Sequence, residues 1–245
     1  MTGMSLGDRM KRYEAVPSIS LTPRMPKIIR IDGKAFHSYT RNMQKPFDPA
    51  MHLVWVETMK YLCANIMGAK LAYAQSDECS VLVTDYDRLD TQAWFDNGVQ
   101  KWASVAASMT TAVWNQTMEL FYPGKLAMFD ARCFAIPVEE AANYFAWRQR
   151  DAVKNSISGL AQAHFSDKLL HGLNGDQKQE LLFQEKGINW SELPGWQKNG
   201  WCVVKREYPA GEGDRQCTRT GWFADDDLPN FAAERGYIEG LLPKE

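Results

Sequence analysis

The chain has 245 residues, of which 45% are hydrophobic and 24% charged, a composition typical of a globular protein with one sizeable core. An apolar run of about 18 residues, a secretory leader, a C-x-x-C pair and metal-ligand spacing of the histidines are all missing, so we expect a cytoplasmic protein with no membrane span, no zinc site and no disulfide framework. The net charge of −2 argues against a strongly basic nucleic-acid-binding protein.

The first half of the chain contains alternating strand-like and helix-like segments. Strands are indicated by short runs rich in β-branched and aromatic residues, and helices by apolar residues that recur every three or four positions. The predicted elements are, in chain order, a strand over 26–32, a helix over 50–67, strands over 70–75 and 79–85, a helix over 94–120 and a strand over 127–136.

This order of elements is the split βαβ arrangement of ferredoxin-like folds. We therefore predict an α+β protein in which residues 1–137 form a ferredoxin-like palm, βαββαβ, with an antiparallel sheet and its helices on one face. In that topology the first and third strands are neighbours. Asp32, at the end of the first strand, should therefore meet Asp77, in the tight connection that begins the third.

The remaining residues, 138–245, are predicted to form a helical and irregular extension that packs on the same unit. Helical patterns cover 139–170 and 176–186, and 201–205 is a possible strand. The tail after Pro209 holds glycines, charges and few periodic apolar residues, so we predict that it is irregular.

Two carboxylates at adjoining strand ends, with a glycine beside one of them, favour a site for hard divalent cations. Magnesium takes oxygen ligands and commonly uses one or two protein carboxylates together with substrate phosphates. We predict that Asp32, the Gly33 carbonyl and Asp77 bind two Mg²⁺ ions. The alternative is that Asp32 only opens a turn and Asp77 only caps a hairpin, both common uses of aspartate.

Six short motifs, in order between about residues 10 and 205, resemble those of the tRNA(His) guanylyltransferase family. They are RIDGKAFH at 30–37, KPFD at 45–48, AQSDECS at 74–80, FDAR at 129–132, WRQ at 147–149 and KQELLF at 178–183. The palm of that family is ferredoxin-like, which agrees with the order of the predicted elements. A basic stretch between residues 9 and 45 is compatible with phosphate binding despite the acidic total.

The resemblance implies an enzyme that uses ATP and GTP or other nucleoside triphosphates to add nucleotides to the 5′ end of a tRNA. The RNA 5′-monophosphate is first adenylylated by ATP, and the 3′-hydroxyl of the incoming nucleotide then displaces AMP. Family members assemble as tetramers, so a homo-oligomer is expected.

The resemblance also assigns roles to individual residues. Asp32 and Asp77 would be catalytic and hold the metals, with Glu78 supporting them. The nucleotide-binding residues would be Lys34, Ala35, Phe36, His37, Lys45, Asp48 and Ser76. The RNA or phosphate contacts would be Lys101, Arg132, Asn155 and Lys178. For the three basic residues, a surface or structural ion pair is an equal alternative.

One departure from the family pattern concerns substrate choice. Members that add a guanylate to tRNA(His) carry H-I-N-N-L-Y just after W-R-Q, whereas this chain has Val153 at the histidine position and keeps only Asn155. Valine has no side-chain donor or acceptor. The sequence therefore favours the guanylyltransferase-like branch, which repairs truncated tRNA 5′ ends by templated synthesis. Guanylate addition to tRNA(His), a palm-type cyclase and a non-catalytic RNA-binding palm protein are the alternatives.

Overall fold

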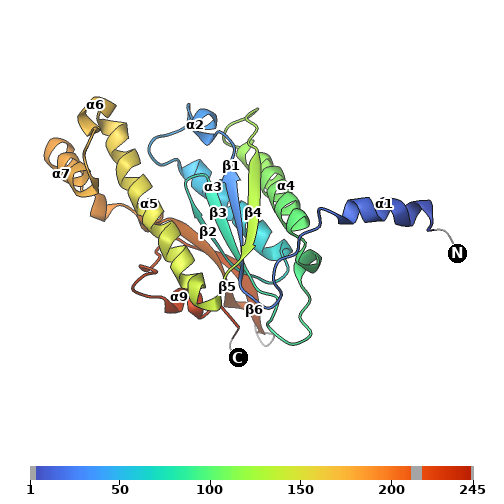
Figure 1. The fold of residues 1–245 in the computed structure, drawn as a ribbon. Helices are drawn as coiled ribbons and strands as arrows, with labels where there is room; N and C mark the ends of the chain where they lie inside the picture. The colour runs from blue at the N-terminus through green and yellow to red at the C-terminus, as the bar shows by residue number, and fades with distance from the viewer. Residues whose placement is uncertain (1–3, 211–216, 244–245) are drawn as a thin grey trace.

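The computed structural model describes residues 4–210 and 217–243. Six strands form one sheet, and helices pack around it (Figure 1). Its strand order is β4-β1-β3-β2-β5-β6, and all neighbours pair antiparallel. The strands are β1 (Lys27–Gly33), β2 (Ala69–Gln75), β3 (Glu78–Val83), β4 (Phe129–Ala135), β5 (Trp201–Ala210) and β6 (Cys217–Asp225).

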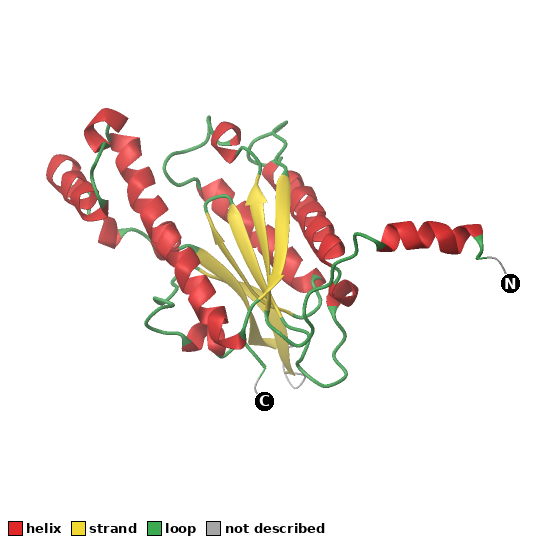
Figure 2. Cartoon of the chain, in the orientation of Figure 1, coloured by secondary structure: helices red, strands yellow, loops and turns green. Residues whose placement is uncertain are grey.

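The helices lie on both faces of the sheet and at its ends (Figure 2). They are α1 (Leu6–Ala15), α2 (Phe36–Tyr39), α3 (Pro49–Asn65), α4 (Val99–Met118), α5 (Ala141–His164), α6 (Asp167–Leu170), α7 (Gly175–Lys186), α8 (Gly195–Asn199) and α9 (Gly236–Glu239), with 3-10 turns at Trp94–Asn97, Val138–Glu140 and Trp190–Glu192. Within the described residues, none of these helices has both the length and the apolar character needed to cross a bilayer.

The palm has the predicted architecture. Strands β4-β1-β3-β2 stand in ferredoxin-like order, and α3 and α4 share one face of the sheet. Because side chains alternate along a strand, Ile29 and Ile31 of β1 face α3 and α4 while Ile28 faces the opposite side. The predicted α+β class and ferredoxin-like palm are therefore confirmed.

The chain after the palm is more regular than predicted. Helix α5 covers the second face of the sheet, where Phe145 packs with Ile28. The prediction of an irregular tail after Pro209 is wrong for Cys217–Asp225, since β5 continues to Ala210 and β6 pairs with it, whereas residues 226–243 are largely irregular apart from the short helix α9. The sequence pattern hides β6 because only Trp222 and Ala224 contact the core, leaving a largely polar strand. Residues 211–216 of that tail lie outside the described residues.

Two other predicted boundaries change. The helix predicted over 94–120 is interrupted, because Phe95, Asp96 and Asn97 adopt left-handed backbone angles before α4 begins. The lead-in before the first strand, where we predicted no element, forms α1, which has no buried residue and projects away from the body (Figure 1). Its exposed apolar side chains include Leu6, Met10 and Tyr13.

Candidate active site

The carboxyl end of β1 and the β2–β3 hairpin tip meet at one end of the sheet. Asp32 is the cross-strand partner of Glu78, and the Gly33 N–H donates to the Asp77 carbonyl at 3.0 Å. The hairpin turns through only two residues, Ser76 and Asp77, because Gln75 pairs directly with Glu78. Glu78 therefore begins β3 rather than belonging to the connection.

Backbone constraints fix the two turns that follow these strands. A Cβ at Gly33 would lie 2.2 Å from the Phe36 ring, which is packed against Tyr39, Trp114 and Phe129, so only glycine fits. Two residues other than glycine, Ala35 and Ser76, have positive φ angles of 55° and 53°. Left-handed backbone at such residues is strained and gathers at functional sites.

The two aspartates are not neutralised by the protein. Among residues 4–210 and 217–243, no lysine, arginine or histidine forms an ion pair with Asp32 or Asp77. Burial raises the pKa of Asp77, and the negative charge of Asp32 raises it further, although hydrogen bonds from its own backbone and Ser76 oppose the shift. An added cation would relieve this repulsion.

Glu78 is held differently from its two neighbours. Its carboxylate accepts from Arg30 at 2.5 Å and lies 2.8 Å from Arg148 Nε, and Arg148 also pairs with Asp151 at 2.9 Å. Arg148 is 4% exposed and its guanidinium lies 4.2 Å from the Trp147 ring centroid. Burial raises the pKa of Glu78 even though both arginines lower it. This network joins β1 and β3 to α5.

A cleft of about 400 Å³ opens beside Asp77. Its lining includes seven of the predicted site residues, namely Phe36, His37, Lys45, Asp48, Ser76, Asp77 and Asn155. Lys45 is directed by a 2.9 Å hydrogen bond from Nζ to Thr40 Oγ1, and Asn155 Nδ2 donates to Gln75 Oε1 at 3.2 Å. Residues from α2, α3, the hairpin and α5 therefore meet around one cavity.

The Asp48 carboxylate is already saturated with donors. It caps α3 through the Ala50 and Met51 N–H groups, and it also accepts from the Gln44 N–H at 3.0 Å and the Tyr122 hydroxyl at 2.6 Å. At 7% exposure it has little surface left for a ligand. Its contacts fix the loop that carries Lys45, a role that the motif alone does not reveal.

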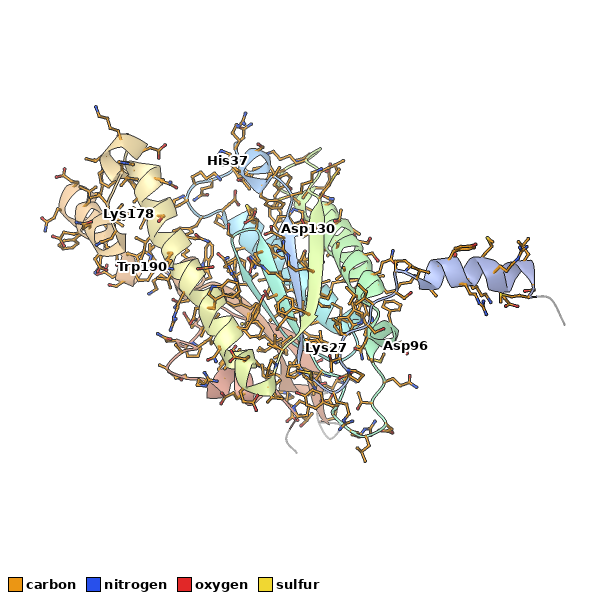
Figure 3. The ribbon with its side chains drawn as sticks, viewed as in Figure 1. Lys27, His37, Asp96, Asp130, Lys178 and Trp190 are labelled. Carbon is orange, nitrogen blue, oxygen red and sulfur yellow. The ribbon has the colours of Figure 1, made fainter. Side chains whose placement is uncertain are left out.

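The other predicted residues lie outside the cleft. Lys34 follows Gly33 with an exposed side chain, and Arg132 is exposed on β4 beside Asp130. Lys178 of α7 donates to Ser158 Oγ at 3.2 Å. Figure 3 shows Lys178 beside α5, and His37 and Asp130 at the end of the sheet where β1 finishes.

Lys101 lies at the opposite end of the sheet. It is in the first turn of α4, just after Asn97, whose side chain donates to Asp85 at 3.0 Å. Asp85 pairs with Lys27 at the start of β1. Figure 3 labels Lys27 and Asp96 at this lower end, away from His37. The structure therefore does not bring Lys101 to the cleft.

Several residues at the site were not predicted. His52 lines the cleft, lies 3.0 Å from Asp226 and stacks on Trp196 with ring centroids 4.5 Å apart. No local pattern links positions this far apart in the chain. Asp130 is the cross-strand partner of Asp32 on its other side. The signal for Asp130 was its place in the FDAR motif.

The described residues contain no group of three or more histidine, cysteine, aspartate or glutamate side chains that would hold a metal. This finding is compatible with magnesium, which completes its octahedral shell with carbonyl oxygens, phosphates and waters. Asp32 and Asp77, which lie close together and pair with no basic side chain in the described part of the chain, have the oxygen ligands that such an ion takes.

Comparison with known proteins identifies the family. A model of the tRNAHis guanylyltransferase family matches residues 7–137. The chain is 30% identical over 227 residues to a probable tRNA(His) guanylyltransferase of Drosophila melanogaster, covering 84% of this chain and 77% of that protein.

Two solved bacterial structures agree with this match over nearly the whole chain. A bacterial tRNA(His) guanylyltransferase-like protein in complex with ATP has a TM-score of 0.90 at 52% identity, covering 97% of this chain and 98% of the other. A protein of the same description in complex with GTP has a TM-score of 0.82 at 47% identity, covering 97% and 99%. The chain therefore belongs to the tRNA(His) guanylyltransferase family of nucleotidyltransferases.

Proposed function

We propose that this protein adds nucleotides to the 5′ end of tRNA in the 3′-to-5′ direction, with Mg²⁺, and that it repairs truncated 5′ ends under the direction of the opposite strand. The main support is one observation. Two carboxylates, Asp32 and Asp77, adjoin each other beside a cleft lined by His37, Lys45 and Ser76, and no basic side chain of residues 4–210 or 217–243 pairs with either of them.

Asp32, Asp77 and the Gly33 carbonyl are the groups that would hold the two ions. Bound Mg²⁺ would supply charge neutralisation at the reacting phosphate and its attacking and leaving oxygens. Glu78 would act indirectly and would not bind a metal ion, because its charge is already paired with two arginines. Its part is to hold β1, β3 and α5 in register around the aspartates.

The cleft would bind the triphosphate. Bacterial relatives at about half identity are known in complex with ATP and with GTP, and this chain matches both along its length. Lys45, fixed by Thr40, presents an ammonium, and His37 and Ser76 present further donors that phosphate oxygens accept. Asp48 would contribute by fixing this loop.

The reaction has two displacements at phosphorus. In the first, an oxygen of the RNA 5′-monophosphate attacks the α-phosphorus of ATP, and pyrophosphate leaves. In the second, the 3′-hydroxyl of the incoming nucleotide attacks the RNA 5′ phosphorus, loses its proton and displaces AMP. The protein's share is to hold the two reacting groups together and keep them aligned.

Val153 supports repair over guanylate addition to tRNA(His). It follows Ala152, which lines the cleft, and its side chain offers no hydrogen bond in the place where guanylate-adding members carry a histidine. Selection by pairing with the opposite strand does not need that contact.

The test is nucleotide addition to 5′-monophosphorylated tRNAs, comparing intact tRNA(His) with a tRNA that lacks its first nucleotide. We expect extension only of the truncated tRNA, always with the Watson–Crick complement, and loss of activity after chelation that Mg²⁺ restores. Guanylate on intact tRNA(His) would instead support the guanylyltransferase alternative. Binding of tRNA without any addition would favour a non-catalytic RNA-binding palm.

The catalytic control is Asp77→Asn against Asp90→Asn. Asp90 is an aspartate whose side chain is 81% exposed and whose partner, Arg88, is equally exposed. Only Asp77→Asn should abolish addition. Equal activity of the two variants would remove the aspartate site from the mechanism.

Three expectations from the sequence remain proposals. We propose a homo-oligomer, a tetramer by resemblance to the family, in which the exposed apolar side chains of α1 are covered by another copy. Light scattering on the full chain measures its mass. We also propose a catalytic palm over 1–137 with an extension over 138–245, and a cytoplasmic location, which limited proteolysis and cell fractionation would test.

A further inference from the structure

A second pocket lies on the far side of the segment that forms one wall of the catalytic cleft. In residues 36–45, Phe36, His37 and Thr40 line the cleft, whereas Ser38, Tyr39, Arg41 and Asn42 line the other pocket together with Lys125 and Leu126. Its volume is about 390 Å³. Two cations and three side chains with polar groups line it, and no carboxylate does.

The side chain of Lys125 is held in place by contacts with the protein. Its Nζ donates to the Tyr39 carbonyl at 2.8 Å and lies 5.5 Å from the Tyr39 ring centroid and 5.6 Å from that of Tyr122. Both rings are fixed, since the Tyr39 hydroxyl accepts from Trp114 Nε1 at 3.1 Å and the Tyr122 hydroxyl donates to Asp48. A half-buried ammonium held over two rings has lost rotamer freedom before any ligand arrives.

This cation also lacks a countercharge. Within residues 4–210 and 217–243, no carboxylate forms an ion pair with Lys125 or Arg41. The Lys125 ammonium uses one of its three N–H donors on the Tyr39 carbonyl, so two donors remain for an anionic oxygen. The adjacent Arg41 adds the planar fork that phosphate accepts.

We propose that Lys125 and Arg41 form a phosphate-binding subsite for the RNA backbone, one step away from the reacting 5′ end. The inference rests on the proposed function, because it places the strand beyond the 5′ nucleotide across α2. The pocket lies apart from the cleft in which Lys45 and His37 face Asp77, so its phosphate is one from the RNA rather than the triphosphate of the nucleotide.

The experiment separates these two sources of phosphate. Affinity is measured for a 5′-monophosphorylated tRNA lacking its first nucleotide, with no triphosphate present, over a series of salt concentrations, and separately for ATP and GTP without RNA. Lys125→Met should weaken RNA binding by about 10-fold and reduce the slope of log affinity against log salt by about one. The double variant with Arg41→Gln should weaken binding by about 100-fold and reduce the slope by about two. Affinity for ATP and GTP should not change.

Matched controls are Lys60→Met and Arg88→Gln, which remove exposed charges of the same kind from surface ion pairs. These should leave the affinity and the salt slope at the unmodified values, and thermal unfolding checks that Lys125→Met remains folded. A loss of nucleotide affinity with unchanged RNA affinity would assign the subsite to the triphosphate and overturn the proposal. Equal RNA affinity for all four variants would also overturn it.

Failure of the proposed function has a different signature. If the unmodified protein adds no nucleotide to any tRNA, the reaction is wrong whatever the variants do. If it extends truncated tRNA, and both Lys125→Met and the double variant with Arg41→Gln bind RNA as tightly as the unmodified protein, only the subsite is wrong. Asp77→Asn should bind RNA without extending it, so this variant shows that RNA affinity and nucleotide addition are measured independently.

Discussion

Acidic side chains lie at both ends of the sheet, and in the described part of the chain only some of them are paired with a basic side chain. Where β1 begins, Lys27 is fully buried 2.7 Å from Asp85, which also accepts from the Arg24 N–H and from Asn97. Where β1 ends, Asp32 and Asp77 adjoin without a cation among the described residues. The two ends therefore differ in whether a basic side chain accompanies these carboxylates, and this difference is the basis of the predictions below.

The largest expected effect breaks the catalytic end alone. Asp77→Asn should reduce nucleotide addition by roughly 10³-fold, about 4 kcal/mol of activation free energy, since it removes a charge that would hold the metal ions. It should leave the free energy of unfolding unchanged or raise it slightly, because the burial of the Asp77 charge and its repulsion from Asp32 both disappear. Single-turnover rates and urea unfolding measure the two quantities. A clear loss of stability would make Asp77 a structural residue.

The next effect breaks the other end. Asp85→Asn leaves the buried ammonium of Lys27 without its countercharge, which should lower the free energy of unfolding by about 3–5 kcal/mol. Asp87→Asn is the matched control two residues away, since Asp87 pairs with Lys70 at the surface and should contribute less than about 1 kcal/mol. Nucleotide addition per folded molecule should be the same in both variants. A rate loss in Asp85→Asn would contradict a purely structural role.

Glu78 lies at the same end of the sheet as Asp77, but like Asp85 it is paired with basic side chains. Glu78→Gln removes the charge that faces Arg148, but burial raises the pKa of Glu78 and Arg148 keeps Asp151 as a partner, so we expect a smaller loss in the free energy of unfolding than for Asp85→Asn. Its rate loss should be far smaller than that of Asp77→Asn. Thermal and urea unfolding of the two variants, with single-turnover rates, test this order. Equal rate losses would restore Glu78 as a direct participant.

The sequence allowed much of the catalytic end to be predicted because its information is local. Strand and helix periods gave the ferredoxin-like order, and that order alone brings Asp32 to the hairpin that holds Asp77. The unpredicted features depend on contacts between distant segments. The contact between His52 and Asp226 is an example, because no local sequence pattern around either residue predicts it. The position of Lys101 at the other end of the sheet likewise depends on the fold, so its predicted contact with RNA or phosphate stays a prediction.

The strand β6 was missed for a related reason. Strand prediction relies on alternating apolar residues, and an edge strand next to solvent needs few of them. Asp48 shows a third limit. Its motif indicates nucleotide binding, but four donors already occupy its carboxylate in the structure, so its contribution passes through the loop that it anchors. A sequence motif records that a residue matters and does not say which atoms it contacts.

The smallest expected effect is a pH dependence of opposite sign at the two ends. Burial alone would raise the pKa of Asp85, but hydrogen bonds from Lys27 and Asn97 and the charge of Lys27 outweigh it, so its folded pKa is lowered. The stability that Asp85 contributes is therefore full above its unfolded pKa of about 3.9 and is lost as the pH falls through the lower folded value. The pKa of Asp77 is raised by burial, so its ionised form destabilises the fold above the folded pKa and this penalty disappears below about pH 3.9.

Urea unfolding from pH 7 to pH 3 makes these signs measurable, taking each variant relative to the unmodified protein. The deficit of Asp85→Asn should stay constant near neutrality and shrink as the pH falls below about 4, because the unmodified protein then loses the same charge. Any advantage of Asp77→Asn should also vanish in acid, but it starts from the opposite sign. Two deficits of the same sign at neutral pH would mean that both ends are structural, and the contrast that identifies the active site would be lost.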